Sequence, residues 1–406
     1  MHHADFMRLW AGQTVSQLGS RITRDGLPLL GVITLRASPA QMGLLSAIGS
    51  APALLVGLVA GVWVDRLRRR PILIAADLLR AALLASIPIA ALLGVLGVGQ
   101  LYVVAALVGA LTVLFDVAYV AYLPSLVERA RVMEGNAKLT LSDSLAEMVG
   151  PGLAGVLVQT LTAPIAILVD ALSFLVSVGS LALIRKPEPL PAPPEARQPL
   201  MRELAEGLRA VRDNHILRAL AGTAGTFSFF GNFFAALYGL YAIRILGMSA
   251  AVLGLTIAAG GAGNLLGALV AERAVRRLGL GATLIGSLIL GASAALLIPL
   301  ARGPLTIAVG MMMAAQLFGD GLWSIYAINE VSLRQTIVPD LLLGRANASM
   351  ELIASGLGPL GALLGGVLGG VLGIRATLFI AVAGRLLACG WLLASPVRGM
   401  RKPSSE

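Results

Sequence analysis

The sequence predicts an all-α membrane protein that crosses the bilayer twelve times, as two pseudo-symmetric halves of six helices each. Three observations predict this fold. Of the 406 residues, 57% are hydrophobic and only 13% are charged, with a mean hydropathy of +0.86, which exceeds the apolar content of soluble domains. Apolar runs of about 20 residues, the length that spans a bilayer, recur along the whole chain. The basic residues gather in alternate loops, as they do in multi-pass membrane proteins.

The twelve expected spans follow the apolar runs in order. In the first half they cover residues 7–35, 41–64, 71–98, 100–124, 137–160 and 163–184. In the second half they cover residues 216–245, 248–271, 279–301, 304–332, 346–371 and 374–395. Glycine and proline inside these runs are compatible with membrane helices, because neighbouring helices can satisfy the backbone groups that they free.

The loop charges predict the orientation in the membrane. One side receives Arg8, the 65–70 loop, Arg131, Lys138, Arg185, Lys186, the 272–277 loop, Arg334, Arg345 and Arg398 to Lys402. The other side receives Arg36, Arg244, Arg302 and Arg375. We therefore expect a multi-pass plasma-membrane protein with both termini in the cytoplasm. The net charge of +10 is explained by this topology, so no nucleic-acid partner is expected.

The expected organisation has four parts: an N-terminal half (1–184), a cytoplasmic linker (185–215), a C-terminal half (216–395) and a cytoplasmic tail (396–406). The linker opens with a proline-rich stretch, 187–194, which favours an extended conformation. Leu200, Leu204, Leu208 and Val211 then recur at helical spacing among charged residues. This pattern predicts a short amphipathic helix along the membrane or under the bundle.

Short matches between the halves indicate an internal duplication. Asn136-Ala and Gly155-Val-Leu recur as Asn347-Ala and Gly366-Val-Leu at a constant separation of 211 residues. Ala11-Gly recurs as Ala221-Gly at a separation of 210. A stretch ending in Glu272-Arg273 is a degenerate copy of the one ending in Asp65-Arg66. Agreement of these separations favours duplication over chance matches in a narrow alphabet.

The loop between the second and third spans, residues 61–71, carries five charges in six residues. Gly61, Asp65, Arg66, Arg69 and Arg70 fit the pattern Gly-x-x-x-Asp-Arg-x-Gly-Arg-Arg, so the loop resembles the signature of the major facilitator superfamily. Arg68 stands where that family has glycine. The alternative interpretation is a topology signal alone.

The resemblance implies a cytoplasmic latch that gates transport. Asp65 would face the start of the eleventh span near Arg345, and Arg66 or Arg69 would meet Asp116 or Glu128. It also implies the fold of that superfamily, with two six-helix halves about a central cavity.

The fifth span contains Gly150, Pro151 and Gly155, and it resembles the Gly-x-x-x-Gly-Pro-x-x-Gly-Gly signature of exporters in this superfamily. Ala146 and Ala154 replace two of the signature glycines, and ordinary small-residue packing is the alternative interpretation. Residues 8–19, 122–127 and 169–174 also resemble macrolide-efflux and enterobactin-exporter-like proteins.

Ionisable groups inside spans are costly and therefore mark candidate sites. Those singled out are Arg21, Arg24, Asp25, Asp116, Asp143, Glu147, Asp170, Asp320, Glu330 and Glu351. Candidates for proton coupling are Asp25, Arg21, Arg24, Asp116, Glu147 and Asp320. Arg21 and Asp25 lie four residues apart on one helix face, so a fixed ion pair and a titrating carboxylate are both open.

The family arrangement also places spans 1, 4, 7 and 10 around a cavity. Asn232, Tyr238, Trp323, Tyr326 and Asn329 are the cavity candidates, and their aromatic and amide groups suit a bulky amphipathic ligand.

The favoured function is a proton-coupled exporter of a small amphipathic compound of drug, macrolide or siderophore type, acting as a monomer by alternating access. An importer and a transport-inactive sensor or scaffold on the same fold remain alternatives. An enzyme is not expected, because the spans contain no histidine and no converging nucleophile or metal-spaced cluster. No cofactor or metal is expected, and the absence of a Gly-x-x-x-x-Gly-Lys-Ser/Thr loop argues against direct drive by ATP.

Overall fold

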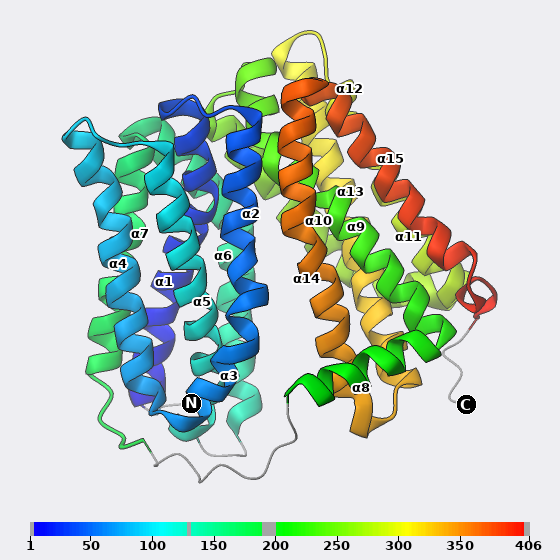
Figure 1. Ribbon diagram of the computed structural model, residues 1–406, viewed down its shortest axis with the longest axis horizontal. Coiled ribbons are helices and arrows are strands. Elements are labelled where there is room, and N and C mark those ends of the chain that lie inside the picture. The colour runs from blue at the N-terminus through cyan, green and yellow to red at the C-terminus, as the bar shows by residue number, and fades with distance from the viewer. Residues whose placement is uncertain (1–3, 128–130, 189–199, 402–406) are drawn as a thin grey trace. The chain divides into compact units, whose positions relative to one another are not determined.

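The computed structural model describes residues 4–127, 131–188 and 200–401. The side chains at positions 58, 59, 62, 65, 200, 201, 203, 204, 340 and 341 also lie outside the described set. The described residues are helical and form no strand. Ten of their helices are long and apolar enough to cross a membrane (Figure 1). The all-α polytopic fold predicted from the sequence is therefore confirmed.

The two remaining expected spans are helical but differ from an uninterrupted apolar helix. The first, α1 (Ala4–Leu29), carries charges in its middle and continues as a π-helical turn, η1 (Leu30–Thr34). The second is divided at Val56 into α2 (Pro39–Leu55) and α3 (Gly57–Arg66). Pro52 lies inside α2 and Gly57 starts α3, and both residues weaken a helix at this position.

The chain packs into two compact units. Unit 1 comprises Met1–Ala37, Ile48–Ala196 and Ser249–Ala258, and unit 2 comprises Ser38–Ala47, Arg197–Met248 and Ala259–Glu406. The expected boundaries at 184 and 215 remain predictions. Each unit takes ten residues from the second helix of the other half of the sequence, and these two segments, 38–47 and 249–258, lie 211 residues apart.

Unit 1 is a helical bundle. Besides α1 to α3 it contains α4 (Arg69–Leu92), α5 (Val98–Leu126), α6 (Val132–Leu161) and α7 (Ala163–Ala182). Helix α7 packs against α1 and α4, α1 also packs against α6, and α5 packs against α4 and α3. Phe6, Phe115 and Tyr122 are among the buried residues of its core.

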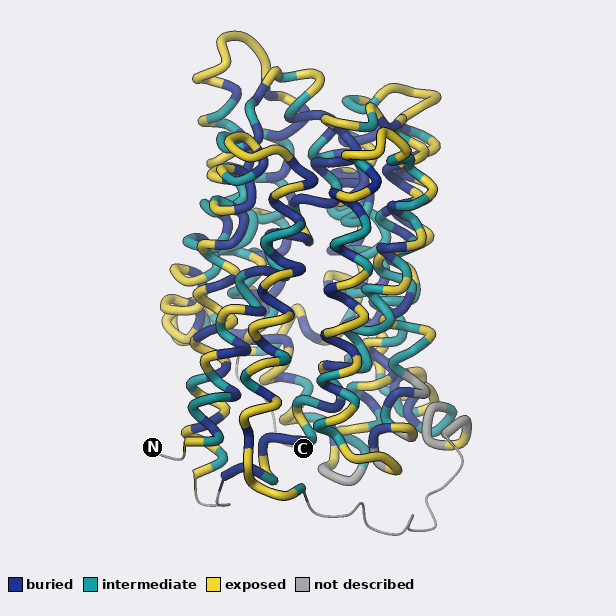
Figure 2. The backbone as a smooth tube through the Cα atoms, turned by 90° about the vertical axis from the view of Figure 1, so that its left-hand side faces the viewer, coloured by how far each residue is buried: buried dark blue, intermediate teal, exposed yellow. Residues whose placement is uncertain are grey.

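Unit 2 has a matching bundle and one additional helix. It contains α8 (Leu200–Asp213), α9 (His215–Leu240), η3 (Tyr241–Ile245), α10 (Ala250–Leu278), α11 (Leu280–Ala294), α12 (Leu297–Leu300), α13 (Leu305–Ile337), α14 (Asp340–Val371), α15 (Ile374–Leu393) and η4 (Pro396–Gly399). Helix α9 packs against α14 and α15, and α11 packs against α13 and α15. Figure 2 shows buried and exposed positions alternating along most helices, as expected for amphipathic packing.

Helix α8 lies across the ends of α9 and α14 (Figure 1). Val211 is buried, whereas Arg202 and Arg212 have exposed side chains. Glu206 forms an ion pair with Arg345 at the start of α14. The linker helix is therefore attached to unit 2.

Helix limits repeat between the two halves. Helices α1 and α9 begin at Ala4 and His215, α4 and α11 at Arg69 and Leu280, and α7 and α15 at Ala163 and Ile374, each pair separated by 211 residues. The backbone repeats as well: Thr162 and Gly373 both have φ close to +85°, a conformation that glycine adopts readily and other residues rarely adopt. The duplication predicted from the sequence is visible in the structure.

Candidate functional site

A cavity of about 590 Å³ lies inside unit 2, among α9, α11, α13, α14 and α15. This volume falls within the range of small-molecule sites, roughly 300–1,000 Å³. The lining residues on which the argument depends are Phe227, Asn232, Leu288, Gly291, Asp320, Trp323, Tyr326, Glu330, Arg334, Glu351 and Arg385. They combine aromatic, amide and charged groups.

An aromatic column consists of Phe234, Arg385, Phe227, Trp323 and Tyr326 in that order, and all of its members except Phe234 line the cavity. The Arg385 guanidinium lies 4.7 Å from the ring centroids of both Phe227 and Phe234. Phe227 stacks on Trp323 at 4.6 Å and 11°, and Trp323 lies 5.3 Å from Tyr326. Both rings are thus within cation–π distance of the guanidinium, which suits the planar, delocalised charge of arginine.

The charged groups of the cavity nearly balance. Three carboxylates (Asp320, Glu330, Glu351) and two guanidiniums (Arg334, Arg385) line it, which leaves one carboxylate in excess when all are ionised. Glu330 pairs with Arg334 at 3.5 Å, and Asp320 interacts electrostatically with Arg385. Glu351 accepts a hydrogen bond from the Ser355 hydroxyl at 2.5 Å.

Two glycines make room for the central charged pair. A Cβ at Gly231 would stand 2.9 Å from Nη2 of Arg385, and a Cβ at Gly260 would overlap Oδ2 of Asp320. Contacts this short are essentially never seen for real Cβ atoms. The positions of Arg385 and Asp320 therefore depend on glycine in the facing helices.

The structure separates the five cavity candidates of the sequence. Asn232, Trp323 and Tyr326 line the cavity. Tyr238 and Asn329 lie on the same helices, α9 and α13, but do not belong to the lining of this cavity. Asn329 is buried and donates a hydrogen bond to the carbonyl of Ile325, one turn earlier in its own helix.

The equivalent place in unit 1 is filled. At the 211-residue separation, Asp77, Arg80, Thr112, Phe115 and Phe174 correspond to Leu288, Gly291, Trp323, Tyr326 and Arg385, all of which line the unit 2 cavity. We call Asp77 and Arg80 the unit 1 plug. Arg80 stands where unit 2 has Gly291, so a long side chain occupies the space that glycine leaves open.

The plug is a buried ion pair held between rings. Asp77 is 0% exposed and Arg80 is 3% exposed, and the two are ion-paired within α4. The Arg80 guanidinium lies 4.4 Å from the Phe115 centroid and 4.2 Å from the Phe174 centroid. Its Nη1 donates to the Thr112 hydroxyl at 3.3 Å. Pairing offsets part of the cost of burying the two charges, although Oδ2 of Asp77 and Nε of Arg80 have no hydrogen-bond partner among the described residues.

A second group of charges in unit 1 joins α1 and α6. Arg21 pairs with Asp143 at 3.2 Å and with Glu147 at 3.6 Å. The sequence placed Arg21 beside Asp25 on one helix face, yet the ion pairs that the structure gives Arg21 run to α6. Asp25 interacts electrostatically with both Arg24 and Arg21.

Asp116 on α5 lies between the two charged groups of unit 1. It interacts electrostatically with Arg80 of the plug and with Arg24 of α1. Asp170 on α7 is 1% exposed and accepts a hydrogen bond from the Ser173 hydroxyl at 3.0 Å. Asp320, the remaining proton-coupling candidate, lies in the unit 2 cavity.

The glycines of the fifth-span motif make close helix contacts. A Cβ at Gly150 would overlap Cβ of Arg21, so this glycine sets the position of the α1 arginine. A Cβ at Gly155 would overlap the carbonyl oxygen of Ala250 at the start of α10. In turn, a Cβ at Gly254 would overlap the carbonyl oxygen of Pro151. Both small-residue packing and a functional motif are consistent with these contacts.

The charged loop after α3 is tied to the segment that follows α7. The Asp65 side chain lies outside the described residues, and Arg66 is exposed. Arg69 pairs with Glu188 at 3.6 Å, and Glu128, one of the two carboxylates expected to meet Arg66 or Arg69, lies outside the described residues. The Glu188 carboxylate also accepts hydrogen bonds from the backbone N–H groups of Arg69 and Arg70, at 2.6 and 3.1 Å. An anion is thus placed at the N-terminus of α4, where the helix dipole stabilises it.

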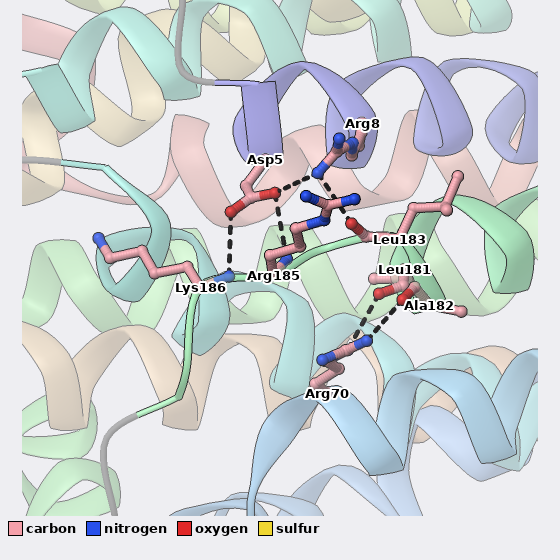
Figure 3. Close-up of polar contacts among 8 residues, drawn as sticks. All are labelled: Asp5, Arg8, Arg70, Leu181, Ala182, Leu183, Arg185 and Lys186. Atoms are coloured by element: carbon pink, nitrogen blue, oxygen red, sulfur yellow. Dashed lines mark hydrogen bonds and ion pairs between the residues drawn. The ribbon is translucent and has the colours of Figure 1, made fainter.

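The C-terminus of α7 is held by arginines from two other helices (Figure 3). Arg70 donates to the carbonyls of Leu181 and Ala182 at 3.0 and 2.8 Å. Arg8 donates to the carbonyl of Leu183 at 2.8 Å. Cations at the last carbonyls of a helix offset its dipole, so these contacts stabilise this end of unit 1.

Asp5, ahead of the first span, fixes the start of the linker. Its carboxylate accepts hydrogen bonds from the backbone N–H groups of Arg185 and Lys186, at 3.2 and 3.0 Å, and from Arg8 at 2.7 Å. Burial acts to raise the pKa of Asp5, but these hydrogen bonds and the charge of Arg8 outweigh it and hold the pKa below its ordinary value of 3.8.

Reasoning from the sequence missed four of these residues: Asp77, Arg80, Glu188 and Arg385. The rule that identified Asp116 would also have identified Asp77, Arg80 and Arg385, because all three interrupt an apolar run. Glu188 carries no comparable signal, since it lies in a proline-rich stretch far along the chain from its partners. Among the described residues, no group of three or more His, Cys, Asp or Glu side chains is arranged to hold a metal ion.

Several curated relatives of the chain are efflux proteins. It is 29% identical over 211 residues to the multidrug efflux pump Tap of Mycolicibacterium fortuitum, covering 50% of this chain and 51% of Tap. It is 27% identical over 216 residues to macrolide efflux protein A of Streptococcus pyogenes, covering 53% of each. The chain thus spans about half the length of the curated relatives it matches.

Solved structures with this fold cover nearly the whole chain. A bacterial homologue of the human lysosomal transporter Spinster, inward-facing and unoccupied, has a TM-score of 0.72 at 15% identity and covers 99% of this chain and 98% of its own. The nucleoside transporter NupG has a TM-score of 0.75 at 12% identity, with 97% and 99% covered. A bacterial homologue of the iron transporter ferroportin has a TM-score of 0.73 at 18% identity, with 97% and 98% covered. At these identities the likeness shows the fold alone.

The family assignment rests on a match over the whole chain. The family model described as transmembrane secretion effector matches residues 1–405. This agrees with the fold of the solved transporters and with the efflux proteins among the relatives. The chain therefore belongs to the transmembrane secretion effector family of major facilitator superfamily transporters.

Proposed function

We propose that this transporter is a proton-coupled exporter of a small amphipathic compound and works by alternating access. The observation that carries the proposal is the unit 2 cavity, whose wall joins an aromatic column to amide and charged groups. Aromatic surface suits the apolar part of such a compound, and the polar groups suit its polar part. Export is the direction named for Tap and macrolide efflux protein A, and it is carried over here as part of the proposal.

Coupling to protons is proposed from the charges of unit 1. A span with Arg21, Arg24 and Asp25 in its middle is costly in lipid unless those groups serve a function or pair internally. The charge of Arg21 is balanced by ion pairs with two carboxylates of α6, Asp143 and Glu147. Asp25 is therefore not needed as the ion-pair partner of Arg21. Asp25 is therefore our first candidate for the proton carrier, and Asp116, Glu147 and Asp320 are its rivals.

Flux in proteoliposomes tests the function. A panel of macrolides, dyes and siderophores is offered with and without an imposed pH gradient. We expect the gradient to drive transport of at least one compound by the wild type. We expect Asp25→Asn to keep substrate binding and exchange but to lose gradient-driven transport. Retained gradient-driven transport in this variant would remove Asp25 from the mechanism and make Asp116 the next candidate.

The latch and the orientation are proposed on the same basis. Asp65→Asn is expected to slow transport at equal expression while leaving binding intact, because a charge at a helix end biases the conformational equilibrium. Unchanged transport would reject the latch.

Reporters that are active only outside the cytoplasm, placed at Ala192 and Arg302, test the cytoplasmic termini. Signal at Arg302 and silence at Ala192 is the expected result.

A further inference from the structure

Arg385 has hydrogen-bonding capacity that the described protein does not use. Its Nε is buried and has no hydrogen-bond partner among the described residues. The Tyr326 hydroxyl, on the same cavity wall, is also buried without a partner in that part of the chain, and the Tyr326 residue is 3% exposed. Buried donors of this kind are costly and are normally paired. The Nε of Arg80 in unit 1 is likewise buried without a described partner, but Arg80 does not belong to the cavity lining, whereas Arg385 and Tyr326 do. An acceptor on a bound molecule is therefore the partner that fits at Arg385.

The position of the guanidinium is fixed before any ligand binds. The ring centroids of Phe227 and Phe234 each lie 4.7 Å from it, and Gly231 leaves the space that Nη2 occupies. Asp320 compensates its charge. A guanidinium carries five N–H donors, so compensation by one carboxylate does not exhaust them. Arg385 is therefore a rigid, directional donor at the cavity wall.

The other residues that line the cavity indicate which chemical groups of a ligand would fit beside that donor. Trp323 lines the cavity between Phe227 and Tyr326 and is 37% exposed, so it offers aromatic surface to a ligand. The lining charges leave one carboxylate in excess, which favours a positive charge elsewhere on the ligand. In unit 1 the corresponding space is filled by Arg80, a flat cation that lies on Phe115. The fold thus accommodates a flat, positively charged group at this place.

We propose that Arg385 is the polar anchor of the unit 2 cavity, and that the ligand is a flat-ringed amphiphile with an oxygen acceptor beside the ring. The acceptor is a carboxylate or a neutral carbonyl oxygen, because both accept from a guanidinium. The proposal rests on the proposed function, in that the cavity is taken to bind the exported compound. It adds a specificity-determining residue and a chemical class of substrate.

Three dyes with one common ring system test this proposal. Rhodamine B carries a carboxylate, its ethyl ester carries a carbonyl, and tetraethylrosamine has neither, while all three share the same cationic xanthene. Equilibrium binding to the purified full-length protein in detergent is measured for each dye. We expect one or both oxygen-bearing dyes to bind about tenfold more tightly than tetraethylrosamine, the size of effect expected for a hydrogen bond to a charged group. Tighter binding of rhodamine B alone identifies a carboxylate as the acceptor. Tighter binding of the ethyl ester alone identifies a neutral carbonyl oxygen, and tighter binding of both shows that either group is accepted.

Variants assign the preference to Arg385. Arg385→Lys keeps the positive charge but removes Nε and the planar fork, so it should bring the ratio of affinities close to one. Gly231→Ala keeps Arg385 but pushes its guanidinium aside, and it should reduce the ratio without any change in charge. Glu351→Gln is the matched control: it should weaken all three dyes by a similar factor and leave the ratio unchanged.

The outcomes separate the role of Arg385 from the function of the protein. Equal affinity of the wild type for the three dyes, no binding of any dye, or an unchanged ratio in Arg385→Lys, would overturn the proposal. Each of these results together with intact gradient-driven export would leave the proposed function standing. Loss of all gradient-driven export in the wild type would instead reject the proposed function, while the affinity ratio would still decide the role of Arg385.

Discussion

Each unit contains an arginine whose guanidinium lies over two phenyl rings, and the two arginines have different surroundings. Arg80 in unit 1 is 3% exposed and ion-paired with Asp77 in the same helix. Arg385 in unit 2 instead lines a cavity, while the Nε of each arginine is buried without a hydrogen-bond partner among the described residues. The same local arrangement thus fills a space in one unit and borders an open space in the other.

The internal repeat explains the difference. Gly291 corresponds to Arg80 and Leu288 to Asp77, so unit 2 lacks both members of the plug. Arg385 itself corresponds to Phe174, one of the rings that hold Arg80. Duplication preserved helix limits, turns and small-residue contacts, whereas the side chains that carry charge diverged. The comparison teaches that equivalent places of the repeat hold a buried ion pair in unit 1 and border a cavity in unit 2.

Breaking the plug should give the largest effect. Asp77→Ala leaves Arg80 as an uncompensated buried charge, which costs about 3–5 kcal/mol. We expect a large fall in the unfolding temperature of the protein in detergent, or loss of folded protein. The double variant Asp77→Leu with Arg80→Met removes both charges and should be clearly more stable than Asp77→Ala. A double variant as unstable as the single one would contradict the assignment of the plug.

Filling the cavity of unit 2 should abolish binding with little loss of stability. Gly291→Leu puts a side chain where unit 1 has Arg80, and its Cβ would meet Cβ of Leu322 at 3.3 Å, a tight contact that requires a small shift of α13. We expect dye affinity to fall by at least about tenfold, since the ligand loses the space in which it packs. Gly286→Leu, on the same helix but with no atom within 4 Å of the added Cβ, is the matched control and should bind normally. Equal binding by both variants would place the ligand elsewhere.

The fifth-span motif should give an intermediate effect. Gly150→Ala forces a Cβ against Arg21, and overpacking of this kind costs typically about 1–3 kcal/mol. We expect a lower unfolding temperature together with weaker gradient-driven transport, because Arg21 holds Asp143 and Glu147. Gly179→Ala, which meets no atom within 4 Å, should change neither. If both variants behave alike, Gly150 does not position the charged residues of α1 and α6.

The fold was largely predictable from the sequence because hydropathy and charge distribution are local properties of the chain. The candidate site was predictable only in part. Trp323 and Tyr326 were found on the expected spans, but the partner of Arg21 was not, because packing brings α6 carboxylates closer than the helix neighbour Asp25. That Gly291 opens a cavity follows only from comparing the three-dimensional surroundings of equivalent positions.

The smallest expected effect is the pH dependence that Asp5 contributes. Its folded-state pKa lies below the ordinary value of 3.8, so its stabilising contribution is present above that value and is lost as the pH falls through the folded pKa. Asp5→Asn lacks this titration. We expect the difference in unfolding temperature between wild type and variant to be constant near neutral pH and to shrink below pH 3.8. If the difference in unfolding temperature grew as the pH fell, the pKa of Asp5 would be raised in the folded protein rather than lowered, and the prediction would be wrong.

The most direct test of the two-arginine comparison is the stabilisation of the protein by a bound dye. The unfolding temperature of wild type, Arg80→Lys and Arg385→Lys is measured with and without saturating rhodamine B ethyl ester, since a ligand that binds the folded state raises it. We predict that Arg80→Lys lowers the unfolding temperature of the free protein but keeps the rise caused by the dye. We predict that Arg385→Lys keeps the unfolding temperature of the free protein and loses most of the rise. The account would be contradicted if the dye raised the unfolding temperature of Arg385→Lys as much as that of the wild type. It would also be contradicted if the dye no longer raised the unfolding temperature of Arg80→Lys.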